Sequence, residues 1–183
     1  MDTEKRNLEA RDWLQAGLEI LKTHGHKGVK LPRLLDALEV SSGSFYWHFK
    51  NVAAYRSELL QFWSDEYVPS LAQRARQSAA SPAQYLDELS RVILKDQSHL
   101  LDTAIREWAQ SNSDARAALE KADDFRRREV KKLSGERGAD KELDTDGEAL
   151  LGAVWRGTVG MTDAVKRLKL MAMVTDPEKP KRP

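Results

Sequence analysis

One stretch constrains this chain more than any other, residues 40–51, which read Val-Ser-Ser-Gly-Ser-Phe-Tyr-Trp-His-Phe-Lys-Asn. Ser41 predicts a helix start, because its hydroxyl can accept a hydrogen bond from a free backbone N–H two or three residues on. Winding a helix from there at about 100° per residue places Phe45 and Phe49 on one face. The opposite face then carries Gly43, Ser44, Trp47, Lys50 and Asn51. Tyr46 and His48 lie on the flanks between the two faces.

The outward face of this predicted helix is unusual. A tryptophan among hydroxyl groups, a histidine and a lysine suits neither a protein core nor an ordinary solvated face. It suits a surface that meets a polar, anionic partner. A helix N-terminus rich in hydroxyl groups directs N–H groups toward an anion, and the helix dipole favours negative charge there. We therefore predict a recognition helix for DNA.

Composition narrows the class of protein. The 183 residues carry a net charge of +1 and include no cysteine, which excludes disulfides and thiolate metal sites. No apolar run approaches the ~20 residues that a membrane span needs. The first residues lack the apolar core of a signal peptide. We expect a cytoplasmic protein with no membrane partner.

Charge is distributed unevenly along the chain. The segment from Lys22 to Lys50 holds five basic residues against two acidic ones, Asp36 and Glu39. The basic residues are Lys22, Lys27, Lys30, Arg33 and Lys50. A basic patch in a nearly neutral chain indicates a protein that binds DNA through one end.

The residues before this stretch predict a helix-turn-helix. Apolar spacing indicates a first helix over about 7–23, ended by Gly25 and Gly28. Pro32 favours the start of a second helix that runs to Leu38. A small shared core is then formed by Leu34, Leu38, Val40, Phe45 and Phe49. Such a core keeps the second helix of a helix-turn-helix rigid enough to enter a major groove.

Residues 37–51, Ala-Leu-Glu-Val-Ser followed by Ser-Gly-Ser-Phe-Tyr-Trp-His-Phe-Lys-Asn, closely resemble the DNA-binding segment of TetR-type transcriptional regulators. The similarity extends back through Trp13-Leu14 and Arg33-Leu34 and fades after about Phe62. Residues 105–111, Ile-Arg-Glu-Trp-Ala-Gln-Ser, look like a segment from one branch of these regulators. The resemblance implies a bacterial, nucleoid-associated protein.

Three positions depart from the family pattern. Glu39 stands where the family usually has glycine in the tight turn, and a positive φ there would cost about 1–2 kcal/mol. Leu35 replaces a small residue at the helix crossing. Val52 replaces a lysine that holds a phosphate. Glu39 and Val52 keep one alternative open, a helical dimerisation or protein-interaction module with weak or lost DNA binding.

The remaining sequence predicts only helices, so the chain is expected to be all-α, because no stretch alternates in polarity as a strand would. The expected helices run from Ala53 to about Tyr67, interrupted or kinked by Pro69, and then from Pro82, from Ser98, over 114–133 and over 146–174. Arg126–Arg128 are expected on an outer face. The expected units are a DNA-binding domain (1–52), a helical regulatory and dimerisation domain (53–175) and a disordered tail (176–183).

Catalytic and metal-binding patterns are missing from the sequence. Ser42-Gly43-Ser44 and His48 lie on one short helix and cannot converge as a catalytic triad does. No glycine-rich phosphate loop occurs. His24 and His26 have no third ligand at useful spacing. We expect a non-enzyme without cofactor or metal.

The resemblance implies which residues touch double-stranded DNA. The expected contacts are Lys30, Arg33, Ser42, Gly43, Ser44, Tyr46, Trp47, His48, Lys50 and Asn51. Lys50 would hold a phosphate. Because the helix lacks Arg, Asn and Gln in its first two turns, base specificity would depend on hydroxyls, thymine methyl contacts and DNA shape. The alternative for Tyr46 and Trp47 is local packing against the first helix.

A single recognition helix covers few base pairs, so a homodimer with half-sites about 34–36 Å apart is expected. The predicted seam comprises Leu119, Leu150, Leu151, Val154, Thr158 and Met161, although packing within the monomer would also explain it. In the resembled family an effector occupies a cavity among the middle helices. Its lining here would be Trp63, Tyr67, Tyr85, His99 and Trp108, although residues of this kind are more often core residues than ligand contacts. Asp102 and Arg106 are expected as a surface pair.

The function that this sequence predicts is a regulator, expected to be a repressor. It would bind a palindromic operator as a homodimer and be released by an unknown small molecule.

Overall fold

The computed structural model describes residues 8–80 and 82–135, and every regular element among them is a helix. This confirms the all-α prediction for that part of the chain. The elements are α1 (Ala10–Gly28), α2 (Leu31–Leu38), α3 (Ser42–His48), α4 (Val52–Phe62), the π-helical η1 (Trp63–Tyr67), α5 (Val68–Gln77), α6 (Pro82–Lys95), α7 (Ser98–Ala109) and α8 (Ser113–Gly135). The helix expected over 146–174 and the tail lie outside the described residues. Within the described ranges, no helix combines the length and the hydropathy that crossing a membrane requires.

An aromatic cluster joins α1, α3 and α4. The Trp13 ring meets Phe45 and Phe49 edge-on, with centroids 5.4 and 6.4 Å away. Tyr55 of α4 closes the cluster at 4.9 Å from Phe49. All four side chains are buried. Edge-to-face aromatic pairs add to the stabilisation that burial provides, so this cluster fixes how α3 sits on α1.

The helix-turn-helix follows the predicted boundaries, with two differences. The first helix does not end at Thr23: it kinks at Gly25 (φ 63°) and continues to Gly28. Ser41 occupies the N-cap position of α3, but its hydroxyl makes no capping hydrogen bond. The Ser44 N–H instead donates to the Ser41 backbone carbonyl at 3.1 Å.

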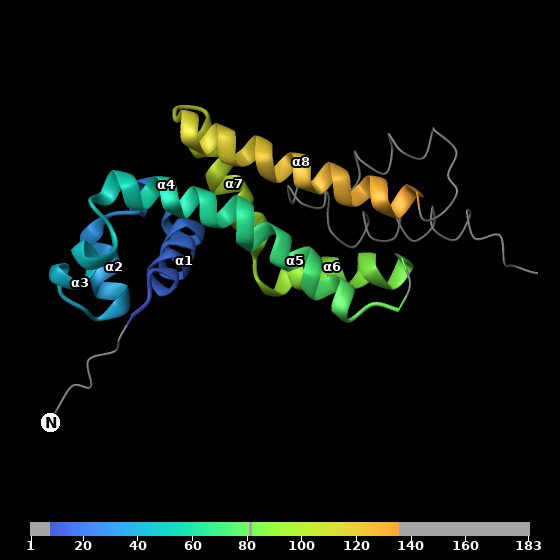
Figure 1. Ribbon diagram of the computed structural model, residues 1–183, viewed down its shortest axis with the longest axis horizontal. Helices are drawn as coiled ribbons and strands as arrows, with labels where there is room; N and C mark the ends of the chain where they lie inside the picture. Colours follow the sequence, from blue (N-terminus) through green and yellow to red (C-terminus); the bar gives the residue numbers. More distant parts are fainter. Residues whose placement is uncertain (1–7, 81, 136–183) are drawn as a thin grey trace, which may run out of the picture.

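Pro69 does not end the fourth helix. α4, η1 and α5 follow one another without a break, and Figure 1 shows them as one long helical segment leading away from α1–α3. The Val68 N–H donates to the Trp63 carbonyl across the π turn. A proline ring normally clashes with the carbonyl four residues back. The wider π turn just before Pro69 relieves that clash, which the sequence pattern alone did not indicate.

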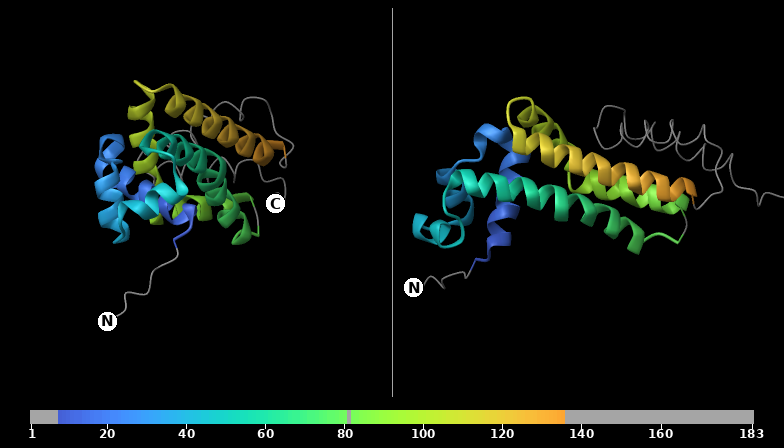
Figure 2. Two further views of the ribbon diagram at one scale, coloured as in Figure 1. Left: turned by 60° about the vertical axis from the view of Figure 1, so that its left-hand side comes forward. Right: turned by 45° about the horizontal axis from the view of Figure 1, so that its top comes forward.

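The remaining helices pack around this long segment. α5 pairs with α6, α7 packs against α1, and α8 lies along α4, η1 and α7. Figure 2 shows the three-helix end and the α5–α6 end at opposite extremities, with α8 alongside. Because α7 touches α1 directly, the two expected domains meet over a broad surface.

A buried ion cluster lies between α7 and α8, contrary to expectation. Asp102 is only 1% exposed and accepts from Arg126 at 2.6 Å and from Arg106 at 2.7 Å. Asp123 bonds both arginines. The predictions of a surface Asp102–Arg106 pair and an outward Arg126 were therefore wrong, although Arg127 and Arg128 are exposed. Mutual hydrogen bonds offset the desolvation of these charges, and only the α7–α8 packing brings them together.

Gly17 is required where α1 crosses α4. A Cβ at this position would lie 2.0 Å from the Tyr55 hydroxyl oxygen and 3.1 Å from Leu59 Cδ1. The hydroxyl cannot yield freely, because it donates to the Trp13 carbonyl at 2.7 Å. We expect Gly17→Ala to lower the free energy of unfolding by about 1–3 kcal/mol, measured by urea denaturation.

A double-mutant cycle isolates this clash. Tyr55→Phe removes the hydroxyl oxygen, so Gly17→Ala should cost less in that background than in the native chain. Strictly additive effects would show that the Tyr55 hydroxyl is not what Gly17 accommodates.

Glu39 carries backbone strain in the α2–α3 turn. Its φ of 56° and ψ of 44° lie in the left-handed region, as the family's glycine at this position implied. Glu39→Gly should raise the free energy of unfolding by about 0.5–1 kcal/mol, because the relieved strain exceeds the extra entropy that glycine loses. Thermal or urea unfolding measures this. Glu39→Ala is the control: an equal gain would assign the effect to removal of the charge.

Candidate nucleic-acid interface

The structure turns the outer face of α3 to solvent. Trp47 is 85% exposed and Tyr46 is 57% exposed, while Phe45 between α3 and α1 is 0% exposed. Ser42, Gly43 and Lys50 are exposed as well. The alternative of local packing is wrong for Trp47. Tyr46 meets the edge of Phe45 with centroids 5.4 Å apart, yet most of its ring remains accessible.

Both ends of α3 are held by backbone hydrogen bonds. At its start, the Ser44 N–H donates to the Ser41 carbonyl, and in the preceding turn the Val40 N–H donates to the Leu35 carbonyl of α2 at 3.2 Å. At its end, the Phe49 N–H donates to the Phe45 carbonyl at 2.9 Å. Ser44 and His48 lie half-buried at the flanks of the outer face. These bonds join the short helix to its flanking turns at both ends.

Two predicted basic residues lie at the start of α2. Lys30 is the N-cap residue of α2 and is exposed. Arg33 is exposed too, and its Nη1 donates to the Gly28 carbonyl at 3.3 Å. That bond directs the Arg33 side chain back along the α1–α2 connection. Lys30 precedes α2 and Lys50 follows α3, and both lysines are exposed.

Asn51 has a structural role that the sequence did not indicate. Its Oδ1 accepts from the Ala54 N–H at 2.8 Å and so caps α4. Val52, which stands in place of the lysine usual in the resembled family, is the first residue of α4. The start of α4 thus lacks a side-chain cation at that position.

Sequence reasoning missed two residues that hold this interface in place. The Tyr55 hydroxyl bonds the Trp13 carbonyl, and Arg56 donates twice to the Val29 carbonyl, at 2.6 and 3.1 Å. These contacts join α4 to both ends of α1. The partners lie 42 and 27 residues apart in the sequence, so no local pattern could have revealed them.

The five aromatic and histidine candidates for an effector site differ in burial and in their neighbours. Trp63, Tyr85 and Trp108 are buried in the core. Trp108 stacks on His26 with ring centroids 5.8 Å apart. His99 is half-buried on α7, and Tyr67 alone of the five lines the open groove between α1 and the long helical segment.

Of the predicted dimer seam, only Leu119 lies among the described residues. It is half-buried on α8 and packs against the core. Leu150, Leu151, Val154, Thr158 and Met161 lie outside the described residues. Within the described ranges, no three His, Asp or Glu side chains are arranged to hold a metal ion.

Comparisons with known proteins agree with this geometry. Residues 14–54 match the family model described as bacterial regulatory proteins, tetR family. The transcriptional regulator AcuR of Cereibacter sphaeroides is 28% identical over 173 residues, covering 90% of this chain and 78% of that protein. The matched family segment contains all of α2 and α3.

Solved structures show the same fold. The reduced form of NemR from E. coli superposes with a TM-score of 0.69 at 18% identity, covering 88% of this chain and 97% of that one. A regulatory protein TetR from Rhodobacter sphaeroides superposes with a TM-score of 0.67 at 23% identity, covering 88% of this chain and 95% of that one. The segment that contains the helix-turn-helix therefore matches the model of the tetR family of bacterial regulatory proteins, and the chain shares its fold with these solved structures.

Proposed function

We propose that this protein represses transcription by binding a palindromic operator as a homodimer in the bacterial cytoplasm, and that a small molecule releases it. The observation that carries the proposal is the outward indole of Trp47 on a helix whose opposite side is locked into the core.

A solvent-exposed indole contributes little to the folding free energy of a monomer. Fully burying a large apolar side chain contributes about 1.5–3 kcal/mol, and Trp47 forgoes nearly all of this. A major groove would cover the ring and offer thymine methyl groups to its apolar surface. DNA binding thus explains an exposure that folding alone does not.

The polar neighbours of Trp47 suit a phosphate backbone. Lys30 and Lys50 flank the helix-turn-helix and would each contact a phosphate as a point charge. Ser42 and Ser44 lie in the first turn of α3, where hydroxyl and backbone N–H groups can meet phosphate or base edges. With neither arginine, asparagine nor glutamine in α3 itself, base selection would rest on methyl contacts and DNA shape.

Release by an effector needs a path from the regulatory helices to α3. The Trp108–His26 stack joins α7 to the C-terminal turn of α1, and Ser57 of α4 donates to Asp114 of α8 at 2.8 Å. A ligand that favours a different packing of α7 would therefore move α1. The two recognition helices of a dimer would shift between DNA-competent and incompetent separations.

A second candidate function is supported by two observations. Glu39 strains the turn before α3, and Val52 supplies no cation at the start of α4. A helical module that dimerises and binds protein partners would tolerate both features, since neither lies in its working surface.

A salt titration against duplex DNA separates the two functions. We expect log Kobs to fall steeply with log[salt], and Lys50→Ala to reduce that slope by roughly 0.9, because one fewer phosphate is neutralised. Trp47→Ala should weaken binding with little change in the slope, because the indole carries no charge. Fluorescence anisotropy at several salt concentrations measures both effects.

The matched control is Lys95→Ala, an exposed lysine that forms the last residue of α6, away from the helix-turn-helix. It should leave the affinity and the slope unchanged. Selection from a random pool should return a sequence with two inverted half-sites. Absence of salt-dependent binding in the native protein would favour the interaction module instead.

A further inference from the structure

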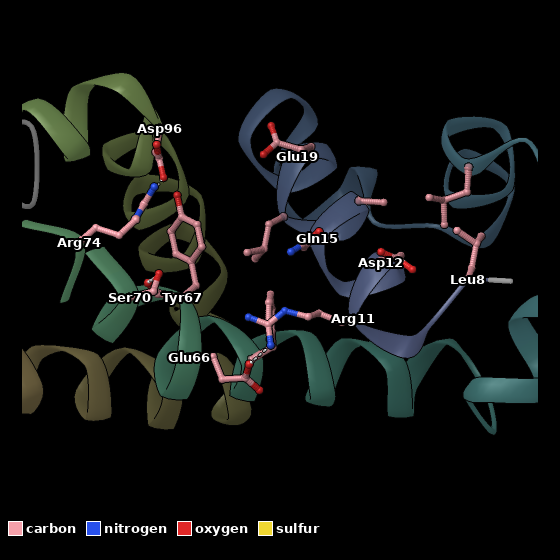
Figure 3. A pocket seen from close by; sticks show the side chains of 14 residues that line it. Leu8, Arg11, Asp12, Gln15, Glu19, Glu66, Tyr67, Ser70, Arg74 and Asp96 are labelled. Carbon is pink, nitrogen blue, oxygen red and sulfur yellow. Dashed lines mark hydrogen bonds and ion pairs between the residues drawn. The ribbon is translucent and has the colours of Figure 1, made fainter. Parts of the chain in front are cut away.

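An open groove of about 720 Å³ lies between α1 and the η1–α5 part of the long helical segment. Figure 3 shows α1 on one wall, and Tyr67, Ser70 and Arg74 on the other. Leu18 and Phe62 contribute buried apolar surface to the groove. The groove is thus lined by both apolar and polar side chains, which come from both expected domains.

Carboxylates outnumber cations in this groove. The charged side chains that line it are Asp12, Glu19, Glu66 and Asp96 against Arg11 and Arg74. Arg11 pairs with Glu66 at 2.7 Å, and Arg74 pairs with Asp96. The remaining two carboxylates are on α1: Asp12 accepts from the Glu9 N–H at 2.8 Å, and Glu19 accepts from Lys22, which is not part of the lining. The groove therefore favours a cation.

The hydroxyl group of Tyr67 is a buried polar group that the fold leaves unsatisfied. It has no hydrogen-bond partner among the described residues. Figure 3 shows the hydroxyl pointing toward the Arg74–Asp96 pair, with Glu19 across the groove on α1. Burial raises the pKa of Tyr67, and the nearby Asp96 raises it further, so the hydroxyl stays protonated and can accept through its oxygen. A buried hydroxyl without a partner is costly, which indicates a missing hydrogen-bonding group.

These features define one chemical class of ligand. An ammonium group offers three donors and a positive charge, which suits the Tyr67 oxygen and the carboxylates of Glu19 and Asp96. An apolar body attached to it would cover Leu18 and Phe62. A carboxylate or phosphate would meet net negative charge here, and a neutral alcohol would leave the excess carboxylate charge uncompensated.

We propose that the groove between α1 and η1–α5 binds a small organic cation, with an ammonium group at Tyr67 and an apolar body along Leu18 and Phe62. The ligand would bridge α1, which supports the recognition helix, and the helical segment that enters the regulatory part. Its effect on DNA affinity rests on the function proposed above, whereas its binding to the free protein does not.

Isothermal titration calorimetry with three matched probes tests the binding. 2-Phenylethylammonium, 2-phenylethanol and 3-phenylpropionate share a phenyl body and differ in the charge of the head group. We expect the ammonium probe to bind at least about tenfold more tightly than the other two, because a hydrogen bond to a charged group contributes more than a neutral one. Equal affinities, or tighter binding of the anion, would overturn the proposal.

Two conservative variants locate the site. Tyr67→Phe removes only the hydroxyl, and Glu19→Gln removes one charge of α1. Each should weaken the ammonium probe by about tenfold, while Glu120→Gln on the exposed side of α8 should not. If both variants unfold near the temperature of the native protein and bind the ammonium probe with unchanged affinity, the probe binds elsewhere. That result would refute the assignment of the site to this groove.

A DNA-binding arm separates the two proposals. If the native protein binds duplex DNA, saturating ammonium probe should change its affinity, and Tyr67→Phe should abolish that change at the same probe concentration. If the native protein binds no DNA but takes up the probe at Tyr67, the regulatory function fails and the groove assignment stands. If the native protein binds duplex DNA but does not bind the probe, the groove assignment fails and the regulatory function stands.

Discussion

The hydrogen bond from the Tyr55 hydroxyl to the Trp13 carbonyl is the contact on which the arrangement of α1, α3 and α4 depends. It joins α4 to α1 inside an aromatic cluster that also holds Phe45 and Phe49. Because those phenylalanines are fixed inward, the other side of α3 has to face solvent. The absence of a side chain at Gly17 lets α1 and α4 approach closely enough for this bond. The orientation of Trp47 is thus a consequence of a buried contact made by other helices.

The long α4–η1–α5 segment extends that constraint into the rest of the molecule. Its first turns are tied to α1 by Tyr55 and Arg56, and later turns supply Tyr67 and Arg74 to the groove. Farther along the core, Trp63 packs beneath Arg126 of the buried ion cluster, with the guanidinium carbon 5.7 Å from the ring centroid. The groove, α8 and the support of α3 are therefore connected by continuous helix and packed side chains.

Much of the helix-turn-helix could be predicted from the sequence, because its signals are local. Pro32 at a helix start and the spacing of Phe45 and Phe49 act within a few residues of one another. Arg126 shows where such reasoning failed: among neighbouring arginines it looks solvated, yet it pairs with Asp102 of another helix. Tyr67 illustrates the same limit at the candidate ligand site, since a ring at helical spacing gives no sign that its hydroxyl finds no partner among the described residues.

The amino-acid sequence by itself determined the helical class, the turn before the recognition helix and which residues of that helix face outward. These follow from backbone preferences and from a periodicity of 3.6 residues, which operate over one or two turns. Tertiary structure decided that Pro69 lies within a continuous helix, that charges pair inside the core and that a groove separates α1 from α5. Those features depend on groups brought together from distant positions, where packing geometry and desolvation, not local pattern, set the free energy.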